Sequence, residues 1–158
     1  MKKYNYIILS FLLFLLPSKV YSLIEVDITR GNLNPLPIAV SPLSSNDESI
    51  SSLNKKLNVT NIGLEISKVV ENNLRTSGLF NPLNKDAFLQ KPDIAHLKPR
   101  FEDWALIKAQ ALITGKVMLQ EEKLRVEFRL WDVLAGKEMM ALAFTTVPNN
   151  WRRVGHII

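Results

Sequence analysis

Leu124-Arg-Val-Glu-Phe-Arg-Leu130 has the sharpest alternation of apolar and charged residues in the chain. This period of two is typical of a β-strand with one buried and one solvated face. A register slip of one residue would bury Arg125, Glu127 and Arg129 together, so the pairing of this strand should be well fixed. The stretch therefore predicts a strand of firm register within a sheet.

The segments on either side of this strand predict an antiparallel meander of three strands. Residues 111–119 lead into it through Gln120, Glu121 and Glu122. Residues 137–147 return after a turn at Ala135 and Gly136. Apolar runs separated by short polar or glycine-containing turns are the signature of consecutive hairpins.

An apolar stripe upstream of the meander predicts one long amphipathic helix. Its members recur with the helical period of 3.6 residues. Thr60 or Asn61 can cap the start of this helix, and Gly78 can adopt a positive φ just past its end. A second, shorter helix is expected over residues 101–108. The stripe consists of Ile62, Ile66, Val69, Val70 and Leu74.

The remaining segments suggest two more strands and a long loop. Residues 24–28 alternate between apolar and polar, and Ile38 to Val40 is a short apolar run that fits a buried strand. Residues 41–58 are polar, without a periodic apolar face, and are interpreted as a surface loop. Helices interleaved with strands, followed by a meander, predict an α/β fold: a mixed sheet of about five strands packed by two to three helices.

The first 22 residues have the layout of a secretory signal peptide. Lys2 and Lys3 form a basic start, residues 7–16 form an apolar run, and Pro17 ends it. Ten apolar residues span only ~15 Å as a helix, about half of a bilayer core, which disfavours a membrane anchor. Cleavage is expected between Ser22 and Leu23. The mature domain would then be residues 23–158, exported from the cytoplasm.

The charge of the chain is concentrated in this leader. The whole sequence has 20 Lys and Arg against 15 Asp and Glu, a formal charge of +5. Without the leader lysines Lys2, Lys3 and Lys19, 17 basic residues face 15 acidic ones. A nearly neutral exported domain argues against a nucleic-acid partner.

The sequence offers no recognisable catalytic site. It contains no cysteine and two histidines, His96 and His156, neither within a known catalytic motif. The paired acids Glu102-Asp103 and Glu121-Glu122 are interpreted as solvated surface groups, because adjacent residues do not converge. The expectation is therefore a binding protein and not an enzyme, with no cofactor, no metal and no small-molecule substrate.

The end of the chain resembles the start of a helix. Asn149 or Asn150 can cap it, and Trp151, Val154 and Ile157 begin an apolar stripe that stops after two turns. A helix this short is marginal alone, so we expect the natural domain to continue past Ile158.

Four separated strings resemble the amino-terminal domain of the TolB family, the periplasmic member of the Tol-Pal system of Gram-negative bacteria. They span the whole chain from residue 25 in order. The resemblance implies a mixed α/β domain similar to the anticodon-binding-domain fold, followed in the family by a β-propeller that is absent here. The strings are EVDITRGNLNPLPIAV (25–40), SGLFNPL (77–83), FRLWDVLAG (128–136) and NWRRVGHII (150–158).

For function, the resemblance implies a cell-envelope interaction module that supports outer-membrane integrity and envelope constriction during cell division. Its extreme N-terminus would bind the periplasmic C-terminal domain of TolA. The lipoprotein Pal would be a partner only where the propeller is present. The residues implied for partner binding are Leu23, Ile24, Glu25, Val26, Asp27, Ile28, Thr29, Arg30, Gly31 and Asn32.

Other functions remain open at this point. An alternative is an exported assembly-factor domain of another outer-membrane lipoprotein machine, which loss of TolA binding would favour. A nucleic-acid binder is weakened by export and charge. A small hydrolase lacks a visible nucleophile and base.

Overall fold

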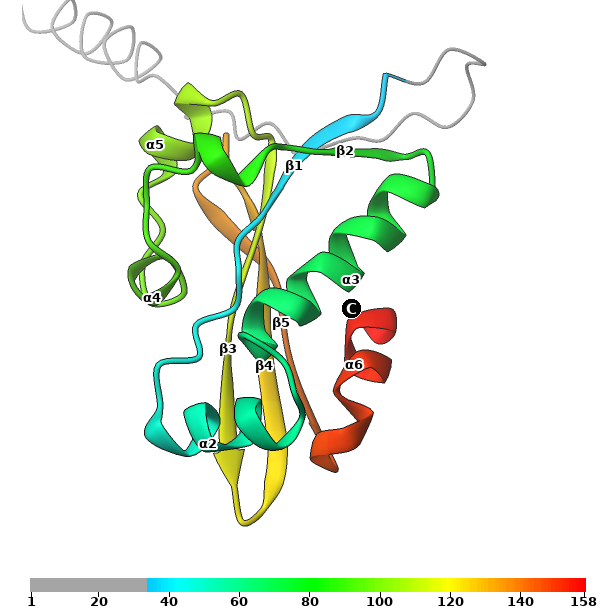
Figure 1. Ribbon diagram of the computed structural model, residues 1–158. Coiled ribbons are helices and arrows are strands. Elements are labelled where there is room, and N and C mark those ends of the chain that lie inside the picture. The colour runs from blue at the N-terminus through cyan, green and yellow to red at the C-terminus, as the bar shows by residue number, and fades with distance from the viewer. Residues whose placement is uncertain (1–33) are drawn as a thin grey trace, which may run out of the picture.

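Five strands form one mixed sheet in the computed structural model, which describes residues 34–158 (Figure 1). The expected signal peptide, its cleavage site and the strand over residues 24–28 lie outside the described residues. The strand order is β2-β1-β3-β4-β5. The strands are β1 (Leu36–Val40), β2 (Phe80–Pro82), β3 (Ala111–Gln120), β4 (Lys123–Asp132) and β5 (Lys137–Thr146).

The sheet has a parallel half and an antiparallel half that meet at β3. Strand β1 pairs in parallel with β2 and with β3, where Ile38 lies opposite Ala111. Strands β3, β4 and β5 form the expected antiparallel meander. In this register Val126 lies opposite Val117 and Phe144, so the apolar positions of the three strands share one face. The fold class predicted from the sequence is confirmed.

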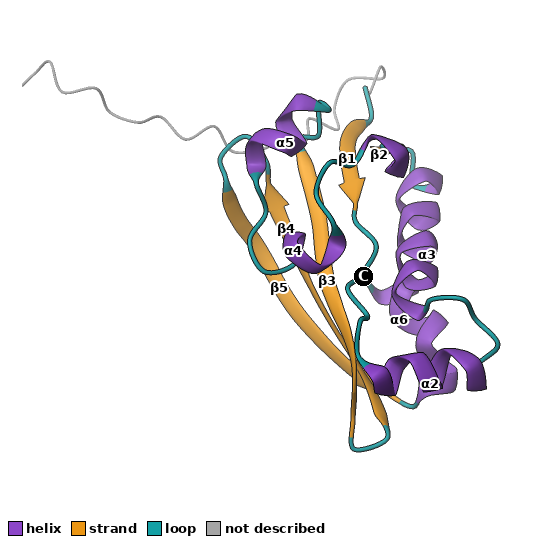
Figure 2. Ribbon diagram, turned by 60° about the vertical axis from the view of Figure 1, so that its left-hand side comes forward, coloured by secondary structure: helices purple, strands orange, loops and turns teal. Residues whose placement is uncertain are grey.

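Three helices cover that apolar face, and Figure 2 shows α3 and α6 side by side along it. They are α2 (Glu48–Lys56), α3 (Ile62–Thr76) and α6 (Trp151–Ile157), the last preceded by the 3₁₀ turn η2 (Pro148–Asn150). The stripe predicted for α3 packs into the core through Ile62, Ile66 and Val70, which are buried, with Val69 and Leu74 at its edge. The larger of two hydrophobic cores therefore lies between these helices and the sheet.

A smaller core lies on the opposite face of the sheet. Trp104 is buried there against Leu112, Ala39 and Val133. The indole Nε1 of Trp104 donates to Oε1 of buried Gln90 at 3.1 Å, and Gln90 also donates to the carbonyl oxygen of Lys98. The segment that connects β2 to β3 covers this smaller core. It contains the 3₁₀ turn η1 (Lys85–Ala87) and the helices α4 (Pro92–Ala95) and α5 (Phe101–Leu106).

The prediction of a surface loop over residues 41–58 is wrong, because α2 lies within it. Ile50 and Leu53 are buried in the larger core, and two apolar residues were too few to reveal a helical period. Asp47 caps the helix by accepting a hydrogen bond from the Ser49 amide at 3.1 Å. Hydrogen bonds from Ser49 hold the pKa of the Asp47 carboxyl below its ordinary value of 3.8.

Gly63 allows the first turn of α3 to touch the chain that follows β1. The Leu43 amide donates to the Gly63 carbonyl oxygen at 3.3 Å. A Cβ atom on Gly63 would overlap the Leu43 carbonyl oxygen. Backbone contact at this point brings Leu43 into the larger core, so the position admits no side chain.

Strand β5 forms an exposed edge of the sheet. Its only strand neighbour in the described chain is β4. From Met139 to Val147 the sequence carries no charge, and Met140 and Leu142 are each nearly half exposed. An edge strand with unpaired backbone groups and a long uncharged stretch can pair with another chain.

We expect Gly63→Ala to destabilise the fold, although alanine favours helices more than glycine does. Overpacking typically lowers the free energy of unfolding by about 1–3 kcal/mol. Urea unfolding followed by circular dichroism measures the change. Asn72→Ala, at an exposed position of the same helix, should stay within about 0.5 kcal/mol of the parent. Equal stability of the two variants would show that α3 and the Leu43 backbone can separate at no cost.

Candidate functional site

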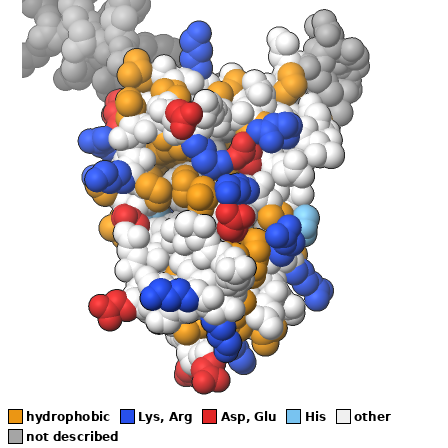
Figure 3. All heavy atoms as spheres, in the orientation of Figure 1, with side chains coloured by type: hydrophobic (Ala, Val, Ile, Leu, Met, Phe, Trp, Pro, Cys, Tyr) orange, Lys and Arg blue, Asp and Glu red, His pale blue; other side chains and the backbone are white. Residues whose placement is uncertain are grey.

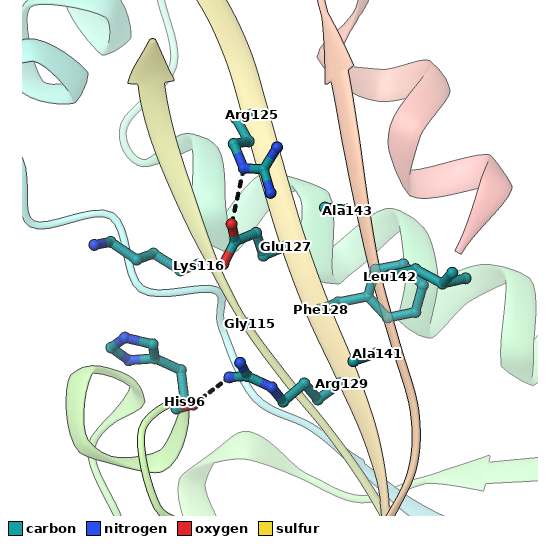
Figure 4. A pocket seen from close by; sticks show the side chains of 10 residues that line it. All are labelled: His96, Gly115, Lys116, Arg125, Glu127, Phe128, Arg129, Ala141, Leu142 and Ala143. Carbon is teal, nitrogen blue, oxygen red and sulfur yellow. Dashed lines mark hydrogen bonds and ion pairs between the residues drawn. The ribbon is translucent and has the colours of Figure 1, made fainter.

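A hollow of about 260 Å³ opens on the sheet face opposite the larger core, beside α4 (Figure 4). Side chains of β3 and β4 form its floor, and β5 forms one wall. Because alternate residues of a strand share a face, Arg125, Glu127 and Arg129 project together on this side. The lining residues are His96, Gly115, Lys116, Arg125, Glu127, Phe128, Arg129, Ala141, Leu142 and Ala143.

Three cations and one carboxylate line the hollow. The Arg125 Nε donates to Oε1 of Glu127 at 2.8 Å, which leaves the two terminal nitrogens of that guanidinium without a partner in the described chain. The Arg129 Nε lies 3.1 Å from Oε2 of Glu138. Lys116 lies opposite Glu127 in the register, and its ammonium forms no ion pair with any of residues 34–158. The hollow therefore holds an excess of positive charge.

A short helix, α4, is tied to the sheet beside this hollow. The Asp93 carboxylate accepts from Ser44 Oγ at 2.7 Å and also from the Asn46 side-chain amide. The Arg129 Nη1 donates to the His96 carbonyl oxygen at 3.1 Å, as Figure 4 shows. The Nδ1 of His96 is buried and has no hydrogen-bond partner within the described part. These contacts fix the wall that carries His96.

A second hollow, of about 410 Å³, lies at the other end of the molecule, between α2, the β3–β4 hairpin and η2. Leu53, Leu119 and Val147 contribute apolar surface to it, and Lys56 and Glu122 contribute charges of opposite sign. Its lining therefore has no dominant sign of charge. It gives less indication of ligand chemistry than the hollow beside α4.

The residues predicted to bind a partner, 23–32, and the predicted cleavage site at Ser22 and Leu23 lie outside the described residues. The described chain begins at exposed Asn34 and Pro35 and enters β1 directly. The Leu36 amide donates to the Leu79 carbonyl oxygen at 2.9 Å. In the sequence, three residues (33–35) separate the predicted binding segment from β1, an interior strand of the sheet.

The two histidines and the paired acids do not converge. His156 lies on α6, with Nδ1 3.2 Å from the Asn73 side-chain nitrogen, whereas His96 lies across the sheet beside α4. Glu102 is exposed on α5. Glu121 and Glu122 are exposed in the β3–β4 turn, both with positive φ. Within residues 34–158 no group of three or more potential ligands from His, Cys, Asp and Glu is placed to hold a metal ion.

One ionisable side chain with a shifted pKa lies away from the hollow. Burial lowers the pKa of Lys85, whose ammonium pairs with Glu71 of α3. Glu71 also pairs with Arg75, one helical turn away, at 2.7 Å. This cluster attaches the segment after β2 to α3, and its role is structural.

Sequence reasoning missed the hollow beside α4. The alternation of Arg125, Glu127 and Arg129 predicted a solvated face, and each of these side chains is about two-thirds buried or slightly less. Lys116 and His96 reach the same place from segments that are distant in the sequence. The pairing of β3 with β4 sets Lys116 opposite Glu127, whereas His96 reaches the hollow from the end of α4.

The fold defines the class of protein as a mixed α/β domain, which two solved bacterial structures share. The structure of TolB from Acinetobacter baumannii is similar, with a TM-score of 0.56 and 19% identity, over 78% of this chain and 26% of that chain. A lipoprotein from Neisseria meningitidis is similar with a TM-score of 0.51 and 17% identity, over 72% of this chain and 81% of that one. At such identities the likeness concerns the fold.

The sequence identifies the family. Residues 24–139 match the model of the TolB amino-terminal domain. The chain is also 74% identical over 149 residues to the Tol-Pal system protein TolB of Pelagibacter ubique, a match that covers 94% of this chain and 33% of that protein. The chain therefore belongs to the TolB amino-terminal domain family, and it spans about a third of the length of this relative.

No helix among residues 34–158 is both long and apolar enough to cross a bilayer.

We expect Asp93→Ala to loosen α4, because it removes the acceptor for Ser44 and Asn46. A lost hydrogen bond to a charged group typically lowers stability by about 1.5–3 kcal/mol. Amide hydrogen exchange measures the local effect, and the Ala95 amide, which donates to the Lys91 carbonyl oxygen, should exchange faster. Asp86→Ala, at an exposed aspartate, is the control. Unchanged exchange at Ala95 would mean that other contacts hold α4.

Proposed function

We propose that the chain is an exported, non-catalytic interaction domain of the Tol-Pal system, which works in the periplasm. The observation that carries this proposal is the 74% identity, over 94% of the chain, to a relative named Tol-Pal system protein TolB. The apolar run and small residues of positions 1–22 support export. In this proposal residues 1–22 are a cleaved signal peptide and residues 23–158 are the mature domain.

The proposed binding element is the segment Leu23 to Asn32, and the proposed partner is the periplasmic C-terminal domain of TolA. Residues 24–28 alternate between apolar and polar side chains, the pattern of an extended strand. Such a strand can add to the edge of another protein's sheet, where backbone hydrogen bonds supply affinity and alternate side chains fill pockets. Ile24, Val26 and Ile28 would fill those pockets.

Through this contact the domain would contribute to outer-membrane integrity and to envelope constriction during cell division. The relative is about three times as long as this chain. Activities that belong to the rest of the relative are therefore not proposed for this chain. Binding of Pal belongs there in this proposal. The alternative, an assembly-factor domain of another outer-membrane lipoprotein machine, would lack affinity for TolA.

We expect deletion of residues 23–32 from the mature chain to abolish TolA binding and to leave the sheet folded, because residues 34–158 supply five paired strands and two hydrophobic cores. Isothermal titration calorimetry against the C-terminal domain of TolA measures binding, and circular dichroism monitors the fold. The control restores ten residues as a Gly-Ser linker. A folded deletion variant that binds TolA as the parent does would refute the assignment of this segment.

We also expect the exported form to begin at Leu23. The full sequence, expressed in a Gram-negative host, should be recovered from the periplasm without its first 22 residues. Intact-mass analysis of the periplasmic fraction measures the start. A chain that stays in the cytoplasm with Met1 or Lys2 at its N-terminus would contradict the proposed leader.

A further inference from the structure

The hollow beside α4 contains more hydrogen-bond donors than acceptors. Lys116 contributes an ammonium without an ion pair in the described chain, and Arg125 uses only Nε toward Glu127. Arg129 uses Nε and Nη1 toward Glu138 and the His96 carbonyl oxygen, which leaves Nη2 available. Glu127 is the single carboxylate in the lining. Because Lys and Arg side chains can only donate, the missing counterpart is an oxygen acceptor with negative charge.

A second observation concerns His96, which stands beside these donors. The Nδ1 of His96 is buried without a hydrogen-bond partner among residues 34–158, and His96 lines the hollow. Buried polar atoms are nearly always paired, so one without a partner calls for an explanation. Figure 3 shows positive and negative side chains intermingled over the face that it presents.

The spacing of the cations favours an extended chain over a single small anion. Cross-strand pairs place Lys116 beside Glu127, and the next pair on this face places Thr114 beside Arg129. Neighbouring pairs on one face are two residues apart along the strand, or roughly 6.6 Å. An extended peptide presents its own alternate side chains at the same interval. Carboxylates at every second position would therefore meet Lys116 and Arg129 in turn.

The shape of the hollow is compatible with such a segment. Figure 4 shows the side chains of Lys116, Glu127 and Arg129 along neighbouring strands, with His96 on the opposite side from β5. On the β5 side the lining includes Ala141 and Ala143, whose exposed side chains are too short to obstruct a neighbouring chain.

We propose that this hollow binds an extended acidic segment of a protein partner, with alternate carboxylates on Lys116 and Arg129. This site is separate from residues 23–32 and does not depend on the function proposed for them. It would give the domain a second contact surface, on the sheet face opposite the larger core.

The test uses the ¹⁵N-labelled chain and two synthetic peptides, acetyl-Glu-Ala-Glu-Ala-Glu-amide and its glutamine counterpart. We expect saturable chemical-shift changes at the amides of His96, Lys116 and Arg129 with the glutamate peptide alone. Lys116→Gln should weaken binding about tenfold, the size of one lost charge-assisted hydrogen bond. Lys123→Gln removes the same charge from an exposed position of β4 and should change the affinity less than about twofold.

The Glu127→Gln variant separates an effect on binding from a failure to fold, because it is expected to bind more tightly than the parent. It removes the competing carboxylate and releases Arg125, so binding of the glutamate peptide should become tighter. Equal binding of the glutamine peptide, or unchanged binding by Lys116→Gln, would overturn the proposal. Inorganic phosphate that binds as tightly as the peptide would also overturn it, in favour of a simple oxyanion site. The variant without residues 23–32 should still bind the peptide, which separates this result from the TolA experiment.

Discussion

Strand β3 is the element on which the rest of the domain depends, because in its first half both faces are buried and both edges are paired. Leu112 points into the smaller core with Trp104, and Ile113 and Val117 point into the larger one. Its first residues pair in parallel with β1, and its whole length pairs antiparallel with β4. The enclosed part needs apolar side chains on both faces, so Ala111 to Ile113 form a continuous apolar run instead of an alternating pattern. Where the strand reaches Lys116, helical cover on one face ends and the hollow begins.

The sequence predicted the elements whose residues carry a clear period. The alternation of β4 and the stripe of α3 each bury one face only, so side-chain chemistry alone reveals their geometry. Helix α2 was missed because it buries only Ile50 and Leu53, and its stability comes from the Asp47 cap and from packing. The hollow could not be predicted for a different reason. Its side chains come from α4, β3, β4 and β5, and their proximity depends on the register of the sheet.

The two proposed contact surfaces use different physics. Residues 23–32 are proposed to act through backbone hydrogen bonds and apolar side chains, which salt affects little. The hollow is proposed to act through partly exposed cations, whose attraction weakens as ionic strength rises. We proposed that this chain is an interaction domain. A domain with two contact surfaces of different chemistry can bind two partners at once, because the partners do not compete for one surface. The tie between Arg129 and the carbonyl oxygen of His96 keeps the second surface assembled before any partner arrives.

The topology of the mixed sheet also sets the order in which its strands can pair while the ribosome synthesises the chain. The ribosome makes β1 early, yet Ile38 has its partner Ala111 in β3, more than 70 residues later. Until then only the three residues of β2 can pair with β1. The meander is the opposite case, because short turns join β3 to β4 and β4 to β5, so each strand meets its neighbour almost as soon as it is made. The strand that follows the proposed binding segment thus spends most of translation without its main neighbour.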